Sequence, residues 1–317
     1  MAQPVNTAPS FSVVRPLRGT QSLVGQMGWV FDRPLITVIE VGWRWIFGIP
    51  FLAVCYAQLK QILAVVSPEA AGLNGIDAQN PWVAAVQLAH VEAMYQPYLL
   101  EVARWLLPIA GLVWVVVSGL GRSVVLRRFD PESAGRLPFR PLQMMALQAA
   151  WLVVLGVTWW GWYRAIGWVA ATHIPAYGEP DLIGFSIWLI FLSLGFFTAW
   201  ALVSWPLSIA PVLMLHEGRS AGSALLESVR LGKPFTGKLV EINLVMGIVR
   251  LALIVLAMVF SAAPLPFSDE LGGDALHVVW AASLIFYLVA NDYFQVVRLK
   301  GLVEFWKMFR GDDPAAQ

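Results

Sequence analysis

The sequence predicts an all-α membrane protein, a polytopic six-helix transmembrane bundle with short interfacial amphipathic helices. Hydrophobic residues make up 58% of the 317 residues and charged residues only 13%. A soluble domain carries about 25% charged residues. The chain also contains 16 Trp and 7 Tyr, two residue types that gather at membrane interfaces.

Hydrophobic segments long enough to cross a bilayer recur along the chain. A hydrocarbon core about 30 Å thick needs about 20 apolar residues per helix. Segments of this kind lie at 38–66, 99–121, 143–172, 182–205, 241–263 and 276–298. We therefore predict a cytoplasmic N-terminal segment with an interfacial helix (1–37), a six-span transmembrane domain (38–298), and a cytoplasmic amphipathic helix with a disordered tail (299–317).

The distribution of basic residues predicts the orientation of these spans. Most of the 21 Lys and Arg lie in the N-terminal segment, the second and fourth connections and the C-terminal tail. The first, third and fifth connections contain acidic residues but no Lys or Arg. Because cytoplasmic loops carry the excess of Lys and Arg, we predict that both termini are cytoplasmic.

Some segments are expected to form helices that lie at the interface, and one span is expected to be broken. Interfacial helices are predicted at 20–31, 81–97 and 299–310, where polar and apolar residues are mixed. Pro206 and Pro211 remove backbone donors from the fourth hydrophobic segment. Its helix is therefore expected to kink or stop near Trp205.

Residues 232–238 (GKPFTGK) match the G-x-x-x-x-G-K core of a phosphate-binding P-loop. A working P-loop follows a strand and continues with Ser or Thr, whereas Leu239 follows here. Pro234 also removes one of the backbone N–H groups that would hold a phosphate. We expect no nucleotide binding, and instead a helix end, a turn and a new helix start at this position.

The segment around this motif, residues 211–233, has the sequence PVLMLHEGRSAGSALLESVRLGK. It predicts a membrane helix that ends in Pro-x-x-x-x-x-Glu-Gly, then a short amphipathic helix capped by Ser220. With the six-span layout, the pattern resembles bacterial six-helix integral membrane proteins like the membrane domain of glycerophosphoryl diester phosphodiesterase, and related stand-alone proteins of unknown function. The resemblance implies a helical fold in a bacterial inner (cytoplasmic) membrane. It transfers no catalytic residue, because no segment here matches the soluble phosphodiesterase domain.

Charged and polar residues within the last two spans form a first candidate site. Ionisable residues inside a membrane are costly and are functional candidates by default. At 1.5 Å per residue, Arg250 and Asp292 lie roughly 13 Å and 9 Å from the predicted cytoplasmic ends of antiparallel spans. We predict that they pair, either to fix helix register or as part of a proton or substrate pathway. The candidate residues are Arg250, Asp292, Glu241, Asn243 and Asn291.

Arginines in the second connection form a second candidate site, for anionic lipid of the cytoplasmic leaflet or for a protein partner. Each Lys or Arg near an anionic leaflet contributes about 1 kcal/mol. Setting the topology alone would also explain these residues. The five members are Arg122, Arg127, Arg128, Arg136 and Arg140.

Two further expectations concern local contacts within helices. Glu40 and Arg44 are four residues apart, in the order that favours an ion pair on a helix. Arg164 lies among several Trp residues, so its side chain is expected to reach lipid headgroups or to stack on an aromatic ring.

The sequence contains no recognisable metalloprotease or metal-binding pattern. There is no H-E-x-x-H, and Cys55 is the only cysteine. His90, His173 and His277 come from three different connections and lack the spacing of helical metal ligands. We therefore expect no metal, no cofactor and no enzymatic activity, and the net charge of +1 indicates no nucleic-acid partner.

Three functions remain open from the sequence. The first is a non-enzymatic protein that acts through lipid or protein contacts, as an accessory subunit, an assembly factor or a lipid organiser, with a membrane protein or a second copy as its partner. The second is a small transporter or lipid-handling protein, which predicts a polar cavity among spans 4–6. The third, a membrane enzyme acting on lipid phosphates, is suggested only by the resemblance.

Overall fold

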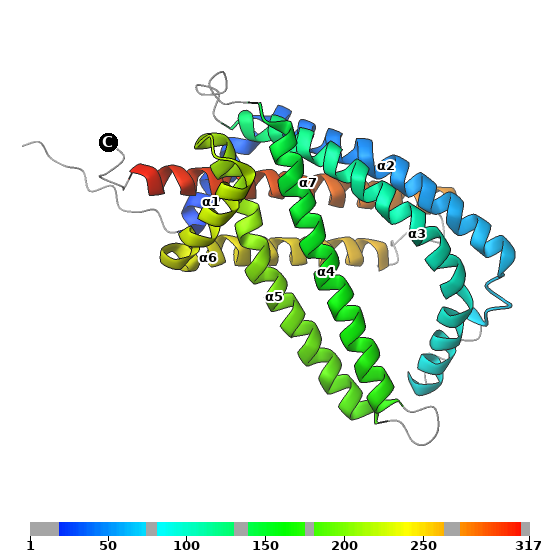
Figure 1. Cartoon of the computed structure of the whole chain (residues 1–317). Coiled ribbons are helices and arrows are strands. Elements are labelled where there is room, and N and C mark those ends of the chain that lie inside the picture. Colours follow the sequence, from blue (N-terminus) through cyan, green and yellow to red (C-terminus); the bar gives the residue numbers. More distant parts are fainter. Residues whose placement is uncertain (1–18, 74–80, 130–138, 175–180, 263–272, 312–317) are drawn as a thin grey trace, which may run out of the picture. The chain divides into compact units, whose positions relative to one another are not determined.

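The computed structural model describes residues 19–73, 81–129, 139–174, 181–262 and 273–311, and the regular structure in these ranges is helical, without strands (Figure 1). The prediction of an all-α fold is thereby confirmed. The helices are α1 (Gly19–Phe31), α2 (Pro34–Val65), α3 (Pro81–Arg127), α4 (Pro141–His173), α5 (Leu182–His216), α6 (Ala221–Ala262) and α7 (Gly273–Gly311).

Five of these helices contain segments long and apolar enough to cross a membrane. They are Pro34–Val65, Gln87–Arg127, Pro141–His173, Leu182–His216 and Leu276–Glu304. The predicted span at 241–263 coincides with a shorter apolar stretch of α6, Val245–Val259. By length and composition, the described residues therefore contain five candidate spans and one shorter apolar helix segment.

Prolines do not end the helices where the sequence suggested. The segment 81–97 is helical, but it continues through Pro97 and Pro108 as the first part of α3. In the same way α5 runs past Trp205 to His216 with Pro206 and Pro211 inside it. The prediction of a separate helix at 81–97 and the alternative that the fourth span stops near Trp205 are both wrong. An interior proline removes one backbone donor, but a helix in an apolar environment can continue past it, because neighbouring groups and local adjustments satisfy the freed carbonyl.

Two further predicted helix boundaries, in α6 and α7, are also absent. Residues 232–238 lie inside α6, and residues 299–310 continue α7 without a break. The predicted turn at 232–238 is therefore wrong, and a P-loop is excluded because a continuous helix offers no loop to hold a phosphate. The start of α6 agrees with the sequence, since Ser220 Oγ accepts a hydrogen bond from the Ser223 N–H at 3.3 Å.

The chain divides into two compact units, and the divisions fall between α1 and α2, within α6 and within α7. The larger unit contains Pro34–Phe235 and Phe305–Gln317, and the smaller contains Met1–Arg33 and Thr236–Glu304. In the larger unit α2 packs on α3, α3 on α4 and α4 on α5, and Figure 1 shows the α2–α3 and α4–α5 neighbours side by side. Among its described residues no comparable contact joins α2 to α5, so these four helices form a row in chain order.

Two glycines let α3 approach both of its neighbours. A Cβ atom at Gly119 would lie 2.5 Å from the Met145 side chain on α4, and one at Gly121 would lie 2.3 Å from the Trp43 ring on α2. Small residues allow close helix contacts in membranes, where packing rather than water exclusion holds helices together. The contacts of α3 with α2 and α4 therefore depend on these two positions.

Candidate functional site

The predicted polar site of the last two helices lies within the smaller unit. Arg250 on α6 donates a hydrogen bond from Nη2 to Oε1 of Gln295 on α7. Asp292 lies one turn before Gln295 and is only 4% exposed, while Asn291 is partly buried. Pairing of Arg250 with Asp292 stays a prediction, but the Gln295 contact joins the same two helices.

Gln295 was not among the predicted site residues, although the sequence contains a signal for it. It follows Asp292 by three residues, a spacing that places both on one helix face. Glu241 and Asn243 belong to α6, but their side chains lie outside the described residues.

A cavity of about 470 Å³ lies between α6 and α7 of the smaller unit. Ser283 and the Tyr287 hydroxyl are the polar groups among side chains that are otherwise apolar. A polar transport pathway among spans 4–6 would need a more polar lining than this. The lining residues are Leu253, Leu256, Ala257, Ala282, Ser283, Phe286 and Tyr287.

The arginines of the second connection have different surroundings. The Arg122 guanidinium lies 6.0 Å from the centre of the Trp43 ring, and that of Arg127 lies 5.6 Å from the Phe139 ring. Arg140 donates from Nη1 to the carbonyl oxygens of Gly218 and Arg219, at 2.7 and 3.2 Å. Arg128 is exposed, and Arg136 lies outside the described residues.

A turn between α5 and α6 forms a polar cluster that the sequence did not predict. The Glu217 carboxylate accepts hydrogen bonds from Arg219 Nε at 2.5 Å and from Trp306 Nε1 at 3.0 Å. His216 packs on the Trp306 ring with a centroid separation of 4.7 Å. Gly218 takes a φ of +65°, a conformation that glycine adopts without strain. The cluster fixes this turn to residue 306 on the last part of α7.

Electrostatics strengthen the Glu217 cluster. The hydrogen bond to the Glu217 carboxylate raises the pKa of the Arg219 guanidinium above its ordinary value. The same guanidinium lies 3.6 Å from the Glu227 carboxylate on α6. The His-Glu-Gly-Arg stretch lies in the segment 211–233 that was recognised from the sequence. The sequence contained no signal for its contact with Trp306, which lies 89 residues after Glu217.

A second buried carboxylate lies on α2. Glu40 is fully buried and accepts hydrogen bonds from Trp43 Nε1 at 2.8 Å and from Arg44 Nε at 3.0 Å. Arg44 Nη2 also lies 2.8 Å from the same carboxylate. The predicted Glu40–Arg44 ion pair is confirmed. The Trp43 N–H bonds to the second oxygen of the carboxylate. With both oxygens hydrogen-bonded, the free-energy cost of burying the charge is offset.

The connected end of the α4–α5 hairpin contains another hydrogen-bonded carboxylate. Asp181, the residue before α5, accepts from the Gly184 N–H at 2.8 Å, and its other oxygen lies 3.1 Å from His173 Nδ1. The hydrogen bond from Gly184 and, after it, the contact with His173 hold the pKa of Asp181 below its ordinary value of 3.8.

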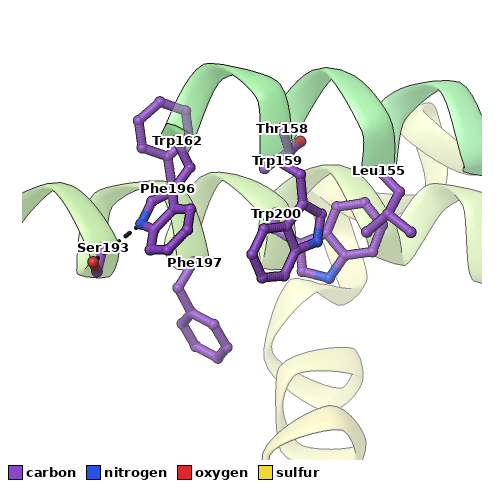
Figure 2. Close-up of a pocket in the computed structure, with 8 residues that line it drawn as sticks. All are labelled: Leu155, Thr158, Trp159, Trp162, Ser193, Phe196, Phe197 and Trp200. Atoms are coloured by element: carbon purple, nitrogen blue, oxygen red, sulfur yellow. Dashed lines mark hydrogen bonds between the residues drawn. The ribbon is translucent and has the colours of Figure 1, made fainter. Parts of the chain in front are cut away.

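An aromatic pocket of about 230 Å³ lies between α4 and α5 (Figure 2). Trp162 Nε1 donates to Ser193 Oγ at 3.1 Å, and Thr158 donates to a backbone carbonyl of its own helix at 2.8 Å. With these polar groups bonded, the pocket offers mainly ring faces and suits an apolar ligand. Its lining residues are Leu155, Thr158, Trp159, Trp162, Ser193, Phe196, Phe197 and Trp200.

Near this pocket, the prediction for Arg164 is confirmed. Its guanidinium lies 5.9 Å from the centre of the Trp160 ring, within the range of a cation–π contact.

Comparisons with protein-family models, with curated proteins and with solved structures found no match. The class of protein therefore follows from the chain's own features, which are those of a helical protein with several segments apolar enough to cross a membrane. Among the described side chains, no group of three His, Cys, Asp or Glu residues could hold a metal ion.

Proposed function

We propose that this chain is a six-span protein of a bacterial inner membrane, with both termini cytoplasmic, that acts without catalysis through contacts with lipid or protein. The open apolar face of α5 carries this proposal. None of the residues in its most apolar 18-residue window is buried within the chain. Phe191 and Phe197, for example, are 65% and 68% exposed. Such a surface needs lipid or a partner helix to cover it.

The proposed topology has support from both charge and length. The predicted spans alternate between connections rich in Lys and Arg and connections that contain neither. The stretch Val245–Val259 is short for a span, but α6 extends beyond it at both ends and completes a sixth crossing in this proposal. The resemblance to bacterial six-helix membrane proteins is kept as part of the proposal.

The arginines of the second connection support contact with the cytoplasmic leaflet. Arg128 is exposed at the end of α3, and Arg122 and Arg127 lie on the last turns of the same helix. Arginines at the end of a span can contact anionic headgroups while their stems lie along apolar surface. Arg140 has a different role, because its guanidinium is bonded to the turn after α5.

Native mass spectrometry of the full chain, extracted from its own membrane in a mild detergent, tests the proposal. A stoichiometric protein partner, or a specifically retained lipid, is the expected result. Phe197→Ala on α5 should weaken a partner's retention, whereas Phe31→Ala, at a residue that is 76% exposed at the end of α1, is the matched control. A lone chain that retains neither protein nor lipid would overturn the proposal.

The Arg250–Gln295 contact favours a second candidate, a small transporter or lipid-handling protein. Placing a guanidinium this far within a pair of hydrophobic helices costs free energy, unless the charge is well paired or takes part in the function. In this case the retained molecule would be a lipid or small solute, and Arg250→Met would abolish its retention. The lining of the α6–α7 cavity is mostly apolar, which favours a lipid over a polar solute.

A further inference from the structure

Two helix faces of matching pattern meet across the α2–α3 pair in the larger unit. Each face consists of four residues at spacing i, i+3, i+4 and i+7, which places them on one side of a helix. Together they line a pocket of about 190 Å³. The α2 residues are Gln58, Gln61, Ile62 and Val65, and the α3 residues are Tyr98, Glu101, Val102 and Trp105.

The polar side chains of this pocket are not used by the fold. Within the described part of the chain, the side chains of Gln58, Gln61, Tyr98 and Glu101 make no hydrogen bond or ion pair. The pocket thus presents one carboxylate, two amides and a phenol toward a common space. The aromatic-lined pocket between α4 and α5 differs, because its Trp162 and Ser193 bond to each other.

The walls of the pocket are held in place by packing behind them. Ile62 is only 6% exposed. Tyr98 packs on a buried cluster that includes Val66 and Val91, and Tyr95 donates from its hydroxyl to the Val66 carbonyl oxygen at 3.1 Å. These contacts fix the outer end of α2 against α3, so Tyr98 is held in place before any ligand arrives.

We propose that the Glu101 pocket binds an organic ammonium group, of the kind present in zwitterionic lipid headgroups and in free amines. The Glu101 carboxylate supplies the opposite charge, and the ring faces of Tyr98 and Trp105 attract a cation through their quadrupoles. The amides of Gln58 and Gln61 accept hydrogen bonds from N–H groups. A single carboxylate is too few for a Ca²⁺ or Mg²⁺ site, which takes about six oxygen ligands.

The position of Glu101 agrees with a headgroup ligand. It lies at the start of the apolar part of α3, near residue 99, where the predicted span begins. Lipid ammonium groups lie at this depth, between hydrocarbon and water. The inference goes beyond the proposed lipid and protein contacts, because those concern the face of α5 and the cytoplasmic arginines at the other end of α3.

Binding to the purified full chain tests the inference. Calorimetric titration with tetramethylammonium or ethanolamine probes a free amine, and native mass spectrometry with added phosphatidylethanolamine or phosphatidylglycerol probes a headgroup. We expect saturable binding of an ammonium probe and preference for phosphatidylethanolamine over phosphatidylglycerol. Glu101→Gln should weaken binding by about fivefold or more, because it removes the charge and keeps the shape.

The controls separate a site from general charge effects. Glu92→Gln removes an exposed carboxylate of the same helix outside the pocket and should leave binding unchanged. Trp105→Leu should weaken binding while circular dichroism reports an unchanged helix content. Binding of lipid alone identifies a headgroup as the ligand, and binding of the soluble amines identifies a free amine. If neither probe binds, or if Glu101→Gln binds as well as the unaltered chain, the inference is overturned.

Discussion

The indole N–H of Trp306 donates a hydrogen bond to the Glu217 carboxylate at 3.0 Å, although 89 residues separate them. Both belong to the larger unit. The carboxylate also accepts from Arg219, and the Trp306 ring packs on His216. One acidic side chain in a turn therefore joins the end of α5, the start of α6 and the last part of α7.

Removing this hydrogen bond should weaken the attachment of the C-terminal residues. Trp306→Phe keeps a ring against His216 but removes the donor. A hydrogen bond to a charged acceptor contributes about 1.5–3 kcal/mol, so we expect a loss of about 2 kcal/mol in unfolding free energy. Unfolding in detergent, followed by circular dichroism, measures it. Trp168→Phe, at a residue that is 62% exposed, is the control, and equal effects of the two changes would contradict the role of Glu217.

The buried Glu40 carboxylate predicts a non-additive pair of substitutions. Glu40→Leu leaves Arg44 and the Trp43 N–H without their acceptor, and breaking a buried pair costs about 3–5 kcal/mol. Because Arg44 is 21% exposed, water lowers this cost to about 2–3 kcal/mol. Adding Arg44→Leu should restore part of the lost stability. A double-mutant cycle measures the coupling, and simple additivity would argue against the ion pair as a stabilising contact.

Stability at the Asp181 end of the α4–α5 hairpin should depend on pH. The folded state lowers the pKa of Asp181 below 3.8. A depressed aspartate pKa contributes stability above the ordinary pKa, and this contribution is lost as the pH falls through the folded value. Asp181→Asn should therefore destabilise the protein near neutral pH, with a difference from the unaltered chain that shrinks as the pH falls below 3.8. A difference that is constant with pH would rule out this contribution.

The predicted Arg250–Asp292 pair has its own test. Asp292 is 4% exposed, so Asp292→Asn should destabilise the smaller unit by about 3 kcal/mol if its charge is paired inside the protein. Thermal unfolding of this variant, compared with Val289→Ala at an exposed position of the same helix, measures the effect. Unchanged folding of Asp292→Asn would show that no buried ion pair is present.

The sequence predicted what depends on local spacing. The helical fold, the positions of five candidate spans and the Glu40–Arg44 pair all follow from hydrophobic runs or from the four-residue repeat of a helix. Stacking of Arg164 on an aromatic ring was one of two predicted contacts, because several Trp residues surround it in the sequence, and the structure identifies the ring as that of Trp160. The helix ends were predicted less well, since proline and glycine signals were outweighed by the continuity of long apolar helices at Pro97, Pro206 and residues 232–238.

Contacts between distant residues had no such signal. Trp306 meets Glu217, and the Glu101 face of α3 meets the Gln58 face of α2, only because the helices take particular rotations about their axes. Those rotations follow from side-chain packing and from small residues such as Gly119 and Gly121, which periodicity does not encode. By itself the sequence determined that this protein is helical and apolar enough for a membrane. Tertiary packing decided which polar side chains come together, because each pairing depends on how complementary helix surfaces fit.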